Sequence, residues 1–332
     1  MKSIDFLRDV RQESTPHSGI FIYTPKGGFF MKKILAFGPL FVIIAALLWS
    51  FDGLLRTSLY SLPPTVVVFY EHLLGFIFLL TVFPKWLPDL KNMTRKTWIA
   101  IAIVSLFSGA LGTIFYTAAL GKINYIPYSV VVLLQQQLQP IWAISTAGLL
   151  LKEKISPKFL FWAVLALIAA YMITFKDLTV NWVTGEQTFW AGLLALLAGL
   201  CWGTSTAISK YVLNKVSFLT GTVLRFTFAP IFALILLIAL GQGQALFSLN
   251  QNQIFTLLLI TFSTGMVGLG FYYYGLKKTP ARVTTLCELV WPASAVAIDF
   301  FYFHKSLSTT QILGIGLLLF AIYRVTQYAK RG

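Results

Sequence analysis

Charged residues are scarce in this sequence. Only 11% of its 332 residues are charged and 57% are hydrophobic, whereas about a quarter of a soluble domain is charged. A water-soluble fold needs a polar exterior, which this composition cannot supply. Apolar stretches of about 20 residues recur along the chain, and a helix of that length crosses the hydrocarbon core of a bilayer. The composition therefore predicts an integral membrane protein.

Histidine and cysteine are also rare. The histidines His17, His72 and His304 fall in separate segments, and the sequence has no phosphate loop, nucleophile elbow or His-Glu-x-x-His motif. Cys201 and Cys287 both lie in apolar stretches and are too few for a disulfide framework. We therefore expect no enzymatic activity, no cofactor and no metal site.

The net charge of +15 has a distribution typical of membrane topology signals. Lys and Arg lie mostly in short loops, without the basic stripe and exposed aromatics of a nucleic-acid-binding surface. If the N-terminus is cytosolic, most of the 26 cations fall on the cytosolic side, and those placed outside are Lys122, Lys176 and Lys305. The pattern predicts a multi-pass protein of the cytoplasmic (inner) membrane with both termini in the cytosol.

Residues 1–33 differ from the rest of the chain because they are polar and contain no long apolar run. Two interpretations stay open: a disordered cytosolic tail, or a stretch that precedes a true start at Met31. Beyond it the sequence predicts an all-α integral membrane fold of ten transmembrane helices, at about 34–57, 63–83, 97–119, 126–150, 158–175, 188–210, 217–240, 252–275, 282–303 and 308–327.

The chain repeats itself. The Leu-Trp-Ser stretch around Trp49 recurs as Cys-Trp-Gly around Trp202, and the same offset brings His72 onto Arg225. The repeat predicts two five-helix copies, one over residues 34–175 and the other over 188–328. Because five is odd, the second copy must enter the membrane from the opposite side. Inverted repeats of this kind are common in secondary transporters.

These motifs resemble the drug/metabolite transporter superfamily in its EamA-type branch, over residues 34–328. The resemblance rests on the two tryptophan stretches, the mid-helix cation Arg225 and the mid-helix prolines Pro140 and Pro292, with Glu153 at the cytosolic exit after Pro140. There are two departures: the helix-two cation is a histidine where arginine is more usual, and the counterpart of Glu153 is a lysine, residue 305. The resemblance implies transport of a small polar metabolite or drug and favours export.

Several ionisable groups fall inside apolar segments, where a charge costs at least about 2.5–3.5 kcal/mol. Asp52 and Arg56 are four residues apart and can pair on one helical face. Glu71 and His72 are adjacent, so their side chains point about 100° apart. The sequence favours a static ion pair for the first couple and leaves His72 open between a cavity residue and a structural hydrogen bond.

The fourth and ninth predicted helices carry the clearest candidates. Pro140 frees the carbonyl of Gln136, and Pro292 frees that of Glu288, so both prolines predict kinks. Freed carbonyls and a carboxylate beside an aromatic wall suit a polar donor group on a substrate. The predicted substrate-binding or coupling residues are Glu288, Gln136, His72, Arg225, Glu71, Trp49, Trp202 and Trp291. The alternative is ordinary interhelical hydrogen bonding in a kinked bundle.

We therefore expect a secondary carrier that works by alternating access, with Glu288 able to couple transport to protons unless Arg225 holds it as a fixed anion. The alternatives are a channel or pore, or a membrane protein without transport activity. The expected partners are a small-molecule substrate and the lipid bilayer, with no nucleic acid; a homodimer is left open.

Overall fold

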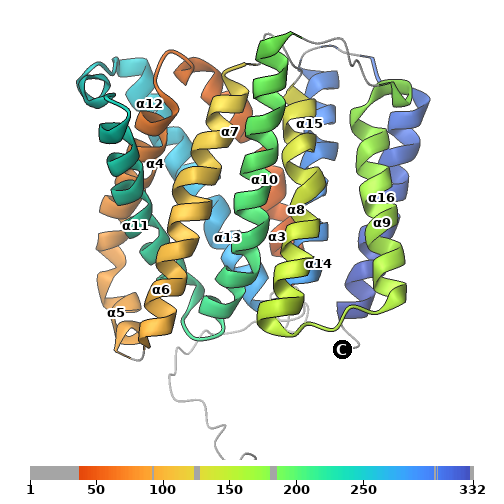
Figure 1. Cartoon of the computed structure of the whole chain (residues 1–332), viewed down its shortest axis with the longest axis horizontal. Coiled ribbons are helices and arrows are strands. Elements are labelled where there is room, and N and C mark those ends of the chain that lie inside the picture. The colour runs from red at the N-terminus through yellow and green to blue at the C-terminus, as the bar shows by residue number, and fades with distance from the viewer. Residues whose placement is uncertain are drawn as a thin grey trace, which may run out of the picture. The chain divides into compact units, whose positions relative to one another are not determined.

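The computed structural model describes residues 37–91, 93–122, 128–179, 185–302, 304 and 306–329, and these belong to one compact unit. The polar stretch 1–33 lies outside the described residues. Every regular element in the described part of the chain is helical, as the sequence predicts. The helices stand side by side in Figure 1, with the chain running up and down between two faces.

The first half of the unit holds one set of helices. They are α3 (Gly38–Arg56), η1 (Thr57–Leu59), α4 (Pro64–Leu79), η2 (Leu80–Val82), α5 (Phe83–Leu90), α6 (Arg95–Val104), η3 (Ser105–Leu111), α7 (Gly112–Leu120), α8 (Tyr128–Leu151), α9 (Pro157–Thr174) and η4 (Lys176–Leu178). The segment η3 is a π-helix that joins α6 and α7 into one continuous span, Arg95–Leu120.

The second half is also helical throughout its described residues. Its elements are α10 (Glu186–Leu213), α11 (Phe218–Ala239), η5 (Gly243–Phe247), α12 (Gln251–Ile260), η6 (Thr261–Gly265), α13 (Met266–Lys278), α14 (Ala281–Cys287), α15 (Val290–Phe301) and α16 (Thr309–Ala329). Here η6 is the π-helix, and it joins α12 and α13 into the span Gln251–Lys278. Each half thus carries one π-helix in its third apolar segment.

Among the described residues, eight helical spans are long and apolar enough to cross a membrane. The apolar helix α4 is shorter, and α8 has 24 residues but contains the glutamine run between Leu134 and Pro140. Local sequence sets several boundaries. The side chains of Thr94, Ser156 and Ser217 cap α6, α9 and α11, because a hydroxyl can satisfy one of the free amides at a helix start.

The most extensive helix packing joins the two halves of the chain: α10 packs on α8, α16 on α9, α13 on α3 and α11 on α4. Glycine makes the closest of these contacts. A Cβ at Gly199 would collide with the backbone carbonyl of Gln135, and one at Gly203 would collide with that of Gln139. The backbones of α8 and α10 therefore approach as small residues allow in membrane bundles.

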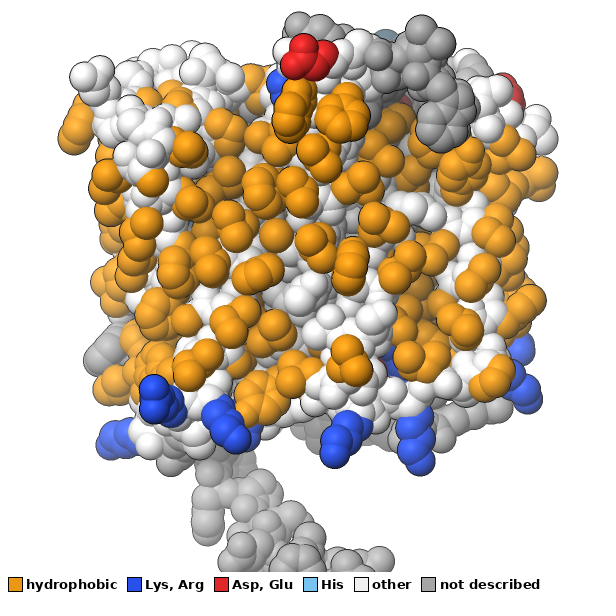
Figure 2. Space-filling model, viewed as in Figure 1, with side chains coloured by type: hydrophobic (Ala, Val, Ile, Leu, Met, Phe, Trp, Pro, Cys, Tyr) orange, Lys and Arg blue, Asp and Glu red, His pale blue; other side chains and the backbone are white. Residues whose placement is uncertain are grey.

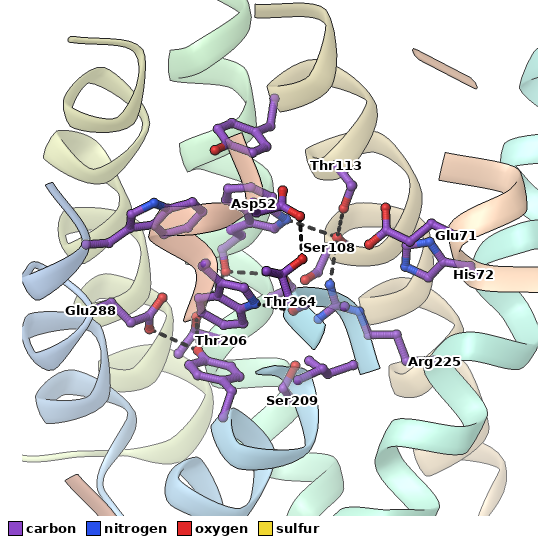
Figure 3. Close-up of a pocket in the computed structure, with 18 of the residues that line it drawn as sticks. Asp52, Glu71, His72, Ser108, Thr113, Thr206, Ser209, Arg225, Thr264 and Glu288 are labelled. Atoms are coloured by element: carbon purple, nitrogen blue, oxygen red, sulfur yellow. Dashed lines mark hydrogen bonds between the residues drawn. The ribbon is translucent and has the colours of Figure 1, made fainter. Parts of the chain in front are cut away.

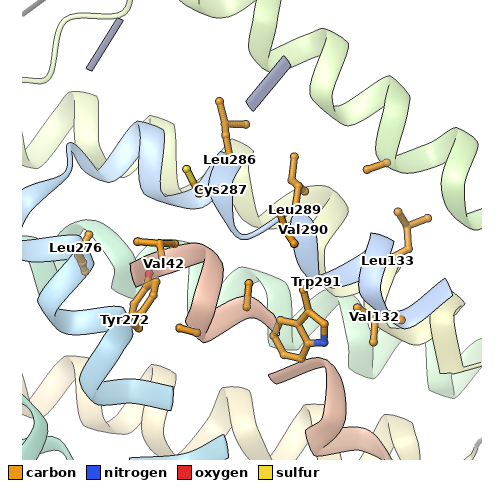
Figure 4. Packing of buried hydrophobic residues seen from close by; sticks show 14 of the residues in the cluster. Val42, Val132, Leu133, Tyr272, Leu276, Leu286, Cys287, Leu289, Val290 and Trp291 are labelled. Atoms are coloured by element: carbon orange, nitrogen blue, oxygen red, sulfur yellow. The ribbon is translucent and has the colours of Figure 1, made fainter. Parts of the chain in front are cut away.

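The surface and the interior are both apolar. Hydrophobic side chains cover the middle of the face in Figure 2, and Lys and Arg gather at its lower edge. Inside, buried residues such as Val42, Leu276, Leu286 and Leu289 pack around the point where α14 gives way to α15 (Figure 4). An apolar belt with a cationic edge is the pattern of a protein embedded in lipid.

Candidate functional site

A cavity lies among the central helices. Both halves of the chain contribute to its walls (Figure 3). Seven of the eight predicted site residues line it: Trp49, Glu71, His72, Trp202, Arg225, Glu288 and Trp291. The eighth, Gln136, is buried and lies outside the lining.

Aromatic rings form one wall of the cavity. The ring centroid of Trp291 lies 5.6 Å from that of Trp49 and 5.9 Å from that of Trp202. Tyr116 adds contacts of 5.4 Å to Trp202 and 5.6 Å to Trp291, and Tyr272 lies 5.1 Å from Trp49. These separations are those of interacting aromatic pairs. The cluster therefore forms a continuous aromatic wall of the cavity.

The two repeated tryptophans each reach into the other half of the chain. Trp49 Nε1 donates a hydrogen bond to the carbonyl of Thr264 at 3.0 Å, and Trp202 Nε1 donates to the carbonyl of Ser108 at 3.0 Å. Both acceptors lie in the π-helices η6 and η3. A π-helix disrupts the regular ladder of backbone hydrogen bonds and is frequent at functional sites. The repeat is therefore matched at the level of single hydrogen bonds.

Glycines make room for these tryptophans. A Cβ at Gly112 would lie 2.6 Å from Trp202 Nε1, and one at Gly268 would lie 2.9 Å from Trp49 Nε1. Gly112 begins α7 directly after η3, and Gly268 lies in the first turn of α13 after η6. The absence of a side chain at these glycines therefore lets the two tryptophans take their places in the cavity wall.

One side of the cavity holds a buried ion cluster. Arg56 binds Asp52, as the spacing predicts, and its Nη2 also lies 2.8 Å from Glu71 Oε2. Arg56 Nη1 donates to Thr117 Oγ1 at 3.1 Å, and Thr264 Oγ1 donates to Asp52 Oδ1 at 2.6 Å. The guanidinium thus has ionic partners from both α3 and α4, and the cluster is more extensive than a simple pair.

Glu71 and His72 both line the cavity although they are adjacent in α4. His72 Nδ1 lies 3.0 Å from the carbonyl of Val68, one turn earlier, and its ring lies 5.0 Å from that of Phe226. The histidine is therefore packed and hydrogen-bonded within the bundle as well as facing the cavity. Their side chains point about 100° apart around α4, so the cavity extends around this part of the helix.

Glu288 lies at another side of the cavity. The helix is interrupted at Glu288 and Leu289, between α14 and α15, just before Pro292. The carboxylate accepts hydrogen bonds from Gln139 Nε2 at 2.5 Å and from the hydroxyl of Tyr272 at 3.0 Å. Its side chain is 3% exposed. Glu288 is thus a buried acid held by neutral donors.

The two mid-helix prolines have different surroundings. The helix α8 continues through Pro140, whereas the ninth apolar segment is broken before Pro292. Within the described residues the side-chain amide of Gln136 has no hydrogen-bond partner. Gln139, three residues further along α8, is the glutamine that lines the cavity.

Arg225 lies across the cavity from Glu288 (Figure 3). Its Nη2 donates to the carbonyl of Ser108 at 3.0 Å, and its guanidinium carbon lies 6.0 Å from the centre of the Tyr273 ring. Within the described part of the chain, Arg225 forms no ion pair with a carboxylate, and its buried Nε has no hydrogen-bond partner. Arg225 and Glu288 therefore do not neutralise each other in this conformation.

Sequence reasoning did not name several lining residues as site residues. They are Ser108, Thr113, Tyr116, Gln139, Ser205, Thr206, Ser209, Thr264 and Tyr272, with Asp52 and Arg56 assigned only to a static pair. Most are small hydroxyl residues, which are common in membrane helices as packing and hydrogen-bonding groups. The glutamine run contained a usable signal for Gln139, because it lies one helical turn from Gln135 and directly before the proline.

These features define a polytopic helical membrane protein in which two sequence repeats share a central polar cavity. The chain belongs to the EamA-like transporter family: the family model matches residues 36–175 and, a second time, residues 189–327. The two matches confirm the resemblance and the duplication. The protein is therefore a membrane transporter for a small molecule.

Curated relatives agree with this family. The chain is 36% identical to a protein named riboflavin transporter ImpX of Fusobacterium nucleatum, over 87% of this chain and 97% of the relative. It is 24% identical to an uncharacterized transporter of Clostridium kluyveri over 87% of this chain and 91% of that protein. A solved crystal structure matches with a TM-score of 0.66 at 16% identity, over 89% of this chain and 98% of the other, which shows a shared fold.

Proposed function

We propose that this protein is a secondary carrier that moves a flavin of the riboflavin class across the cytoplasmic membrane by alternating access. One observation carries the proposal: the aromatic wall of the central cavity is held by hydrogen bonds that cross between the two repeats, from Trp49 and from Trp202. A ligand bound against this wall contacts both repeats. Rocking of one repeat against the other would then expose it to either side of the membrane.

In this proposal the ten apolar segments of the sequence all span the membrane, and the two five-helix copies are inverted relative to each other. The π-helical segments α6–η3–α7 and α12–η6–α13 each count as one span, as do α14 and α15 together. The cationic edge of Figure 2 supports a cytosolic face at that end. Both termini are then cytosolic.

The flavin assignment rests on two kinds of support. A relative with 36% identity is named a riboflavin transporter, and in the cavity Trp291 lies within stacking distance of both Trp49 and Trp202. A tricyclic flavin ring is flat and apolar on its faces, so tryptophan faces suit it. Ionic and hydroxyl side chains around the rings suit its carbonyls and its sugar-alcohol chain.

Flux of riboflavin into proteoliposomes tests the proposal. A carrier gives saturable uptake and counterflow, in which internal unlabelled riboflavin accelerates entry of labelled riboflavin. Flux that rises linearly far above millimolar concentrations would instead show a channel. Riboflavin that neither enters nor competes would contradict the flavin assignment, and labelled metabolite mixtures would then identify another substrate by the same counterflow readout.

Proton coupling is assigned to Glu288, a buried acid that lines the cavity and has no cationic partner within the described residues. The substitution Glu288→Gln keeps the shape of the side chain and removes its titration. We expect the variant to lose flux driven by a pH gradient while it retains exchange at saturating riboflavin. Glu186→Gln is the matched control, because Glu186 is exposed at the start of α10. Gradient-driven flux equal to wild type in Glu288→Gln would rule out this role.

A further inference from the structure

The charges that line the cavity are not equally available to a ligand. Arg56 is surrounded by Asp52 and Glu71, with further hydrogen bonds to the cluster from Thr117 and Thr264. Breaking up such a buried cluster costs several kcal/mol. Its charges are therefore already satisfied within the protein, and the cluster is a poor place for a ligand to bind.

Arg225 and the acid Glu288 are different. Arg225 contacts a backbone carbonyl and keeps a buried Nε that has no hydrogen-bond partner among the described residues. Beside Glu288, Gln139 donates to the carboxylate through Nε2, but its own buried Oε1 has no partner in the same part of the chain. Buried polar atoms usually have partners. The cavity thus holds an unused donor on one side and an unused acceptor on the other.

The aromatic wall connects these two sides. Tyr272 donates to Glu288 and lies against Trp49. At the other end, Trp202 and Arg225 donate to the same carbonyl, that of Ser108. Figure 3 shows Glu288 and Arg225 on opposite sides of the cavity. A flat ligand on this wall therefore meets a hydrogen-bond donor, Arg225, at one end. At the other end it meets the acceptors of Glu288 and Gln139.

The donors and acceptors of a flavin match the two ends of the cavity in one orientation. The ring edge carries two carbonyls and two bare ring nitrogens, which are acceptors, and a single N–H that lies between the carbonyls. The sugar-alcohol chain carries hydroxyls, each of which can donate. A guanidinium has donors and no acceptor, and an ionised carboxylate has acceptors and no donor. The reverse orientation would place ring carbonyls against the Glu288 carboxylate.

The geometry points to one bound orientation: the carbonyl edge of the flavin ring lies on Arg225, and its hydroxyl chain lies on Glu288 and Gln139. This inference rests on the proposed flavin substrate. It also predicts selectivity. A phosphate ester at the end of the chain would meet the Glu288 carboxylate, so flavin mononucleotide is rejected by like-charge repulsion in a water-poor site.

The experiment uses three ligands and the purified full-length protein, with binding followed by flavin fluorescence. The ligands are riboflavin, lumiflavin, which has the same ring with a methyl group in place of the chain, and flavin mononucleotide. For wild type we expect riboflavin and lumiflavin to bind and the phosphate ester to bind much more weakly. Failure of wild type to bind either uncharged flavin would overturn the proposed substrate itself, before any variant is compared.

The variants test the orientation. We expect Glu288→Gln to raise the dissociation constant of riboflavin about tenfold, the usual difference between a charged and a neutral acceptor. The dissociation constant of lumiflavin should stay within about twofold of wild type. The difference in affinity between riboflavin and flavin mononucleotide should become smaller. Gln139→Leu should likewise weaken riboflavin alone. Unchanged lumiflavin binding in these variants also shows that they fold.

Arg225→Gln gives the opposite pattern. We expect it to weaken riboflavin and lumiflavin by the same factor, at least about tenfold, with Arg95→Gln as the control because Arg95 is exposed at the start of α6. Arg225→Lys, which retains the charge, recovers part of the loss for both ligands. Two results would overturn the orientation while leaving the proposed substrate intact. One is that Glu288→Gln weakens the binding of riboflavin and lumiflavin equally, and the other is that Arg225→Gln loses the binding of riboflavin alone.

Discussion

The two repeats of this transporter share a π-helix and a tryptophan hydrogen bond to it, but they differ in charge. Around Ser108 in the first repeat, a carbonyl in a π-helix accepts from Trp202, Thr113 and Arg225. Around Thr264 in the second, the equivalent carbonyl accepts from the side chain of Trp49, while the Thr264 hydroxyl joins the Asp52 cluster. The shared scaffold thus presents a cation at one place and an ion cluster at the other.

The features that the two copies share are thus structural, whereas the charged groups differ between them. Packing between the halves and the tryptophan hydrogen bonds occur in both copies. Charged groups need no such symmetry, since a substrate with unlike ends benefits from unlike walls. The two arginines of the cavity represent the two roles: buried Arg56 belongs to the protein's own ion cluster, and half-buried Arg225 contacts the carbonyl of Ser108 and the ring of Tyr273.

The largest expected effect comes from removing Arg56. Arg56→Met leaves Asp52 and Glu71 buried without a cation, and breaking a buried ion pair in this way typically costs about 3–5 kcal/mol. We expect the variant to unfold at a much lower temperature in detergent. Arg225→Met should lower the free energy of unfolding by less than about 1.5 kcal/mol, because Ser108 keeps two other donors.

A triple variant checks the cause. Replacing the whole cluster by neutral residues, as Asp52→Asn, Arg56→Met and Glu71→Gln together, should recover much of the stability lost in Arg56→Met, because no unpaired charge remains buried. A triple variant as unstable as Arg56→Met alone would show that shape rather than charge determines the loss. Equal losses for Arg56→Met and Arg225→Met would contradict the division of roles between the arginines.

The matched glycines give a smaller effect. Gly112→Ala and Gly268→Ala each push a methyl group against the tryptophan that contacts the opposite π-helix, and overpacking typically costs about 1–3 kcal/mol. At Gly112 the added Cβ would also lie 2.9 Å from the carbonyl of Phe107, whereas at Gly268 the nearest carbonyl, that of Ser263, is 3.8 Å away. We therefore expect the larger loss of thermal stability at Gly112.

Riboflavin flux in the same two variants sharpens the comparison, because each displaces one tryptophan of the cavity wall. Gly270→Ala in α13 is the matched control, since a Cβ there would meet no atom within 4 Å. If Gly112→Ala and Gly268→Ala retained the stability and flux of the control, these tryptophan contacts would be dispensable.

The sequence predicted the helical class, the apolar segments and the duplication well, because these depend on hydropathy and on local repetition. Ion pairing of Asp52 with Arg56 also followed from their spacing. The choice between Gln136 and Gln139 did not. The two lie three residues apart, so their directions differ by about 60° around the helix. Which one faces the cavity depends on how α8 is rotated against Gly199 and Gly203 of α10, and no local pattern encodes that rotation.

Contacts between residues on different helices could not be predicted from the sequence either. The sequence placed Arg225 and Glu288 at mid-membrane and left their pairing open, because a hydropathy pattern gives depth and not the distance between helices. The π-helices had no recognisable signature either. They became visible only as matched irregularities at Ser105–Leu111 and Thr261–Gly265. Their shared acceptors for Trp49 and Trp202 then explained why the tryptophans recur.

The smallest expected effect concerns contacts by which the first repeat holds helix starts of the second. Asp89 in α5 accepts from the backbone amide of Ser217 at 2.7 Å and from the hydroxyl of Thr220 at 2.5 Å, at the start of α11. Glu153 does the same for α14 through the amides of Ala281 and Arg282. Partial burial alone would raise the pKa of Asp89, but the hydrogen bonds from Thr220 and Ser217 outweigh burial and hold this pKa below its ordinary value.

The sign of the pH effect follows from that direction. A carboxyl whose pKa is lower in the folded state stabilises the fold above its unfolded pKa, and the contribution disappears as the pH falls through the folded value. We expect Asp89→Asn to lower the free energy of unfolding by about 1 kcal/mol at pH 7, and the difference from wild type to shrink at an acidic pH below the ordinary aspartate pKa of about 3.9. Thermal unfolding in detergent at both pH values measures it, with Glu186→Gln as the control. A difference that stayed constant with pH would show that charge on Asp89 does not support α11.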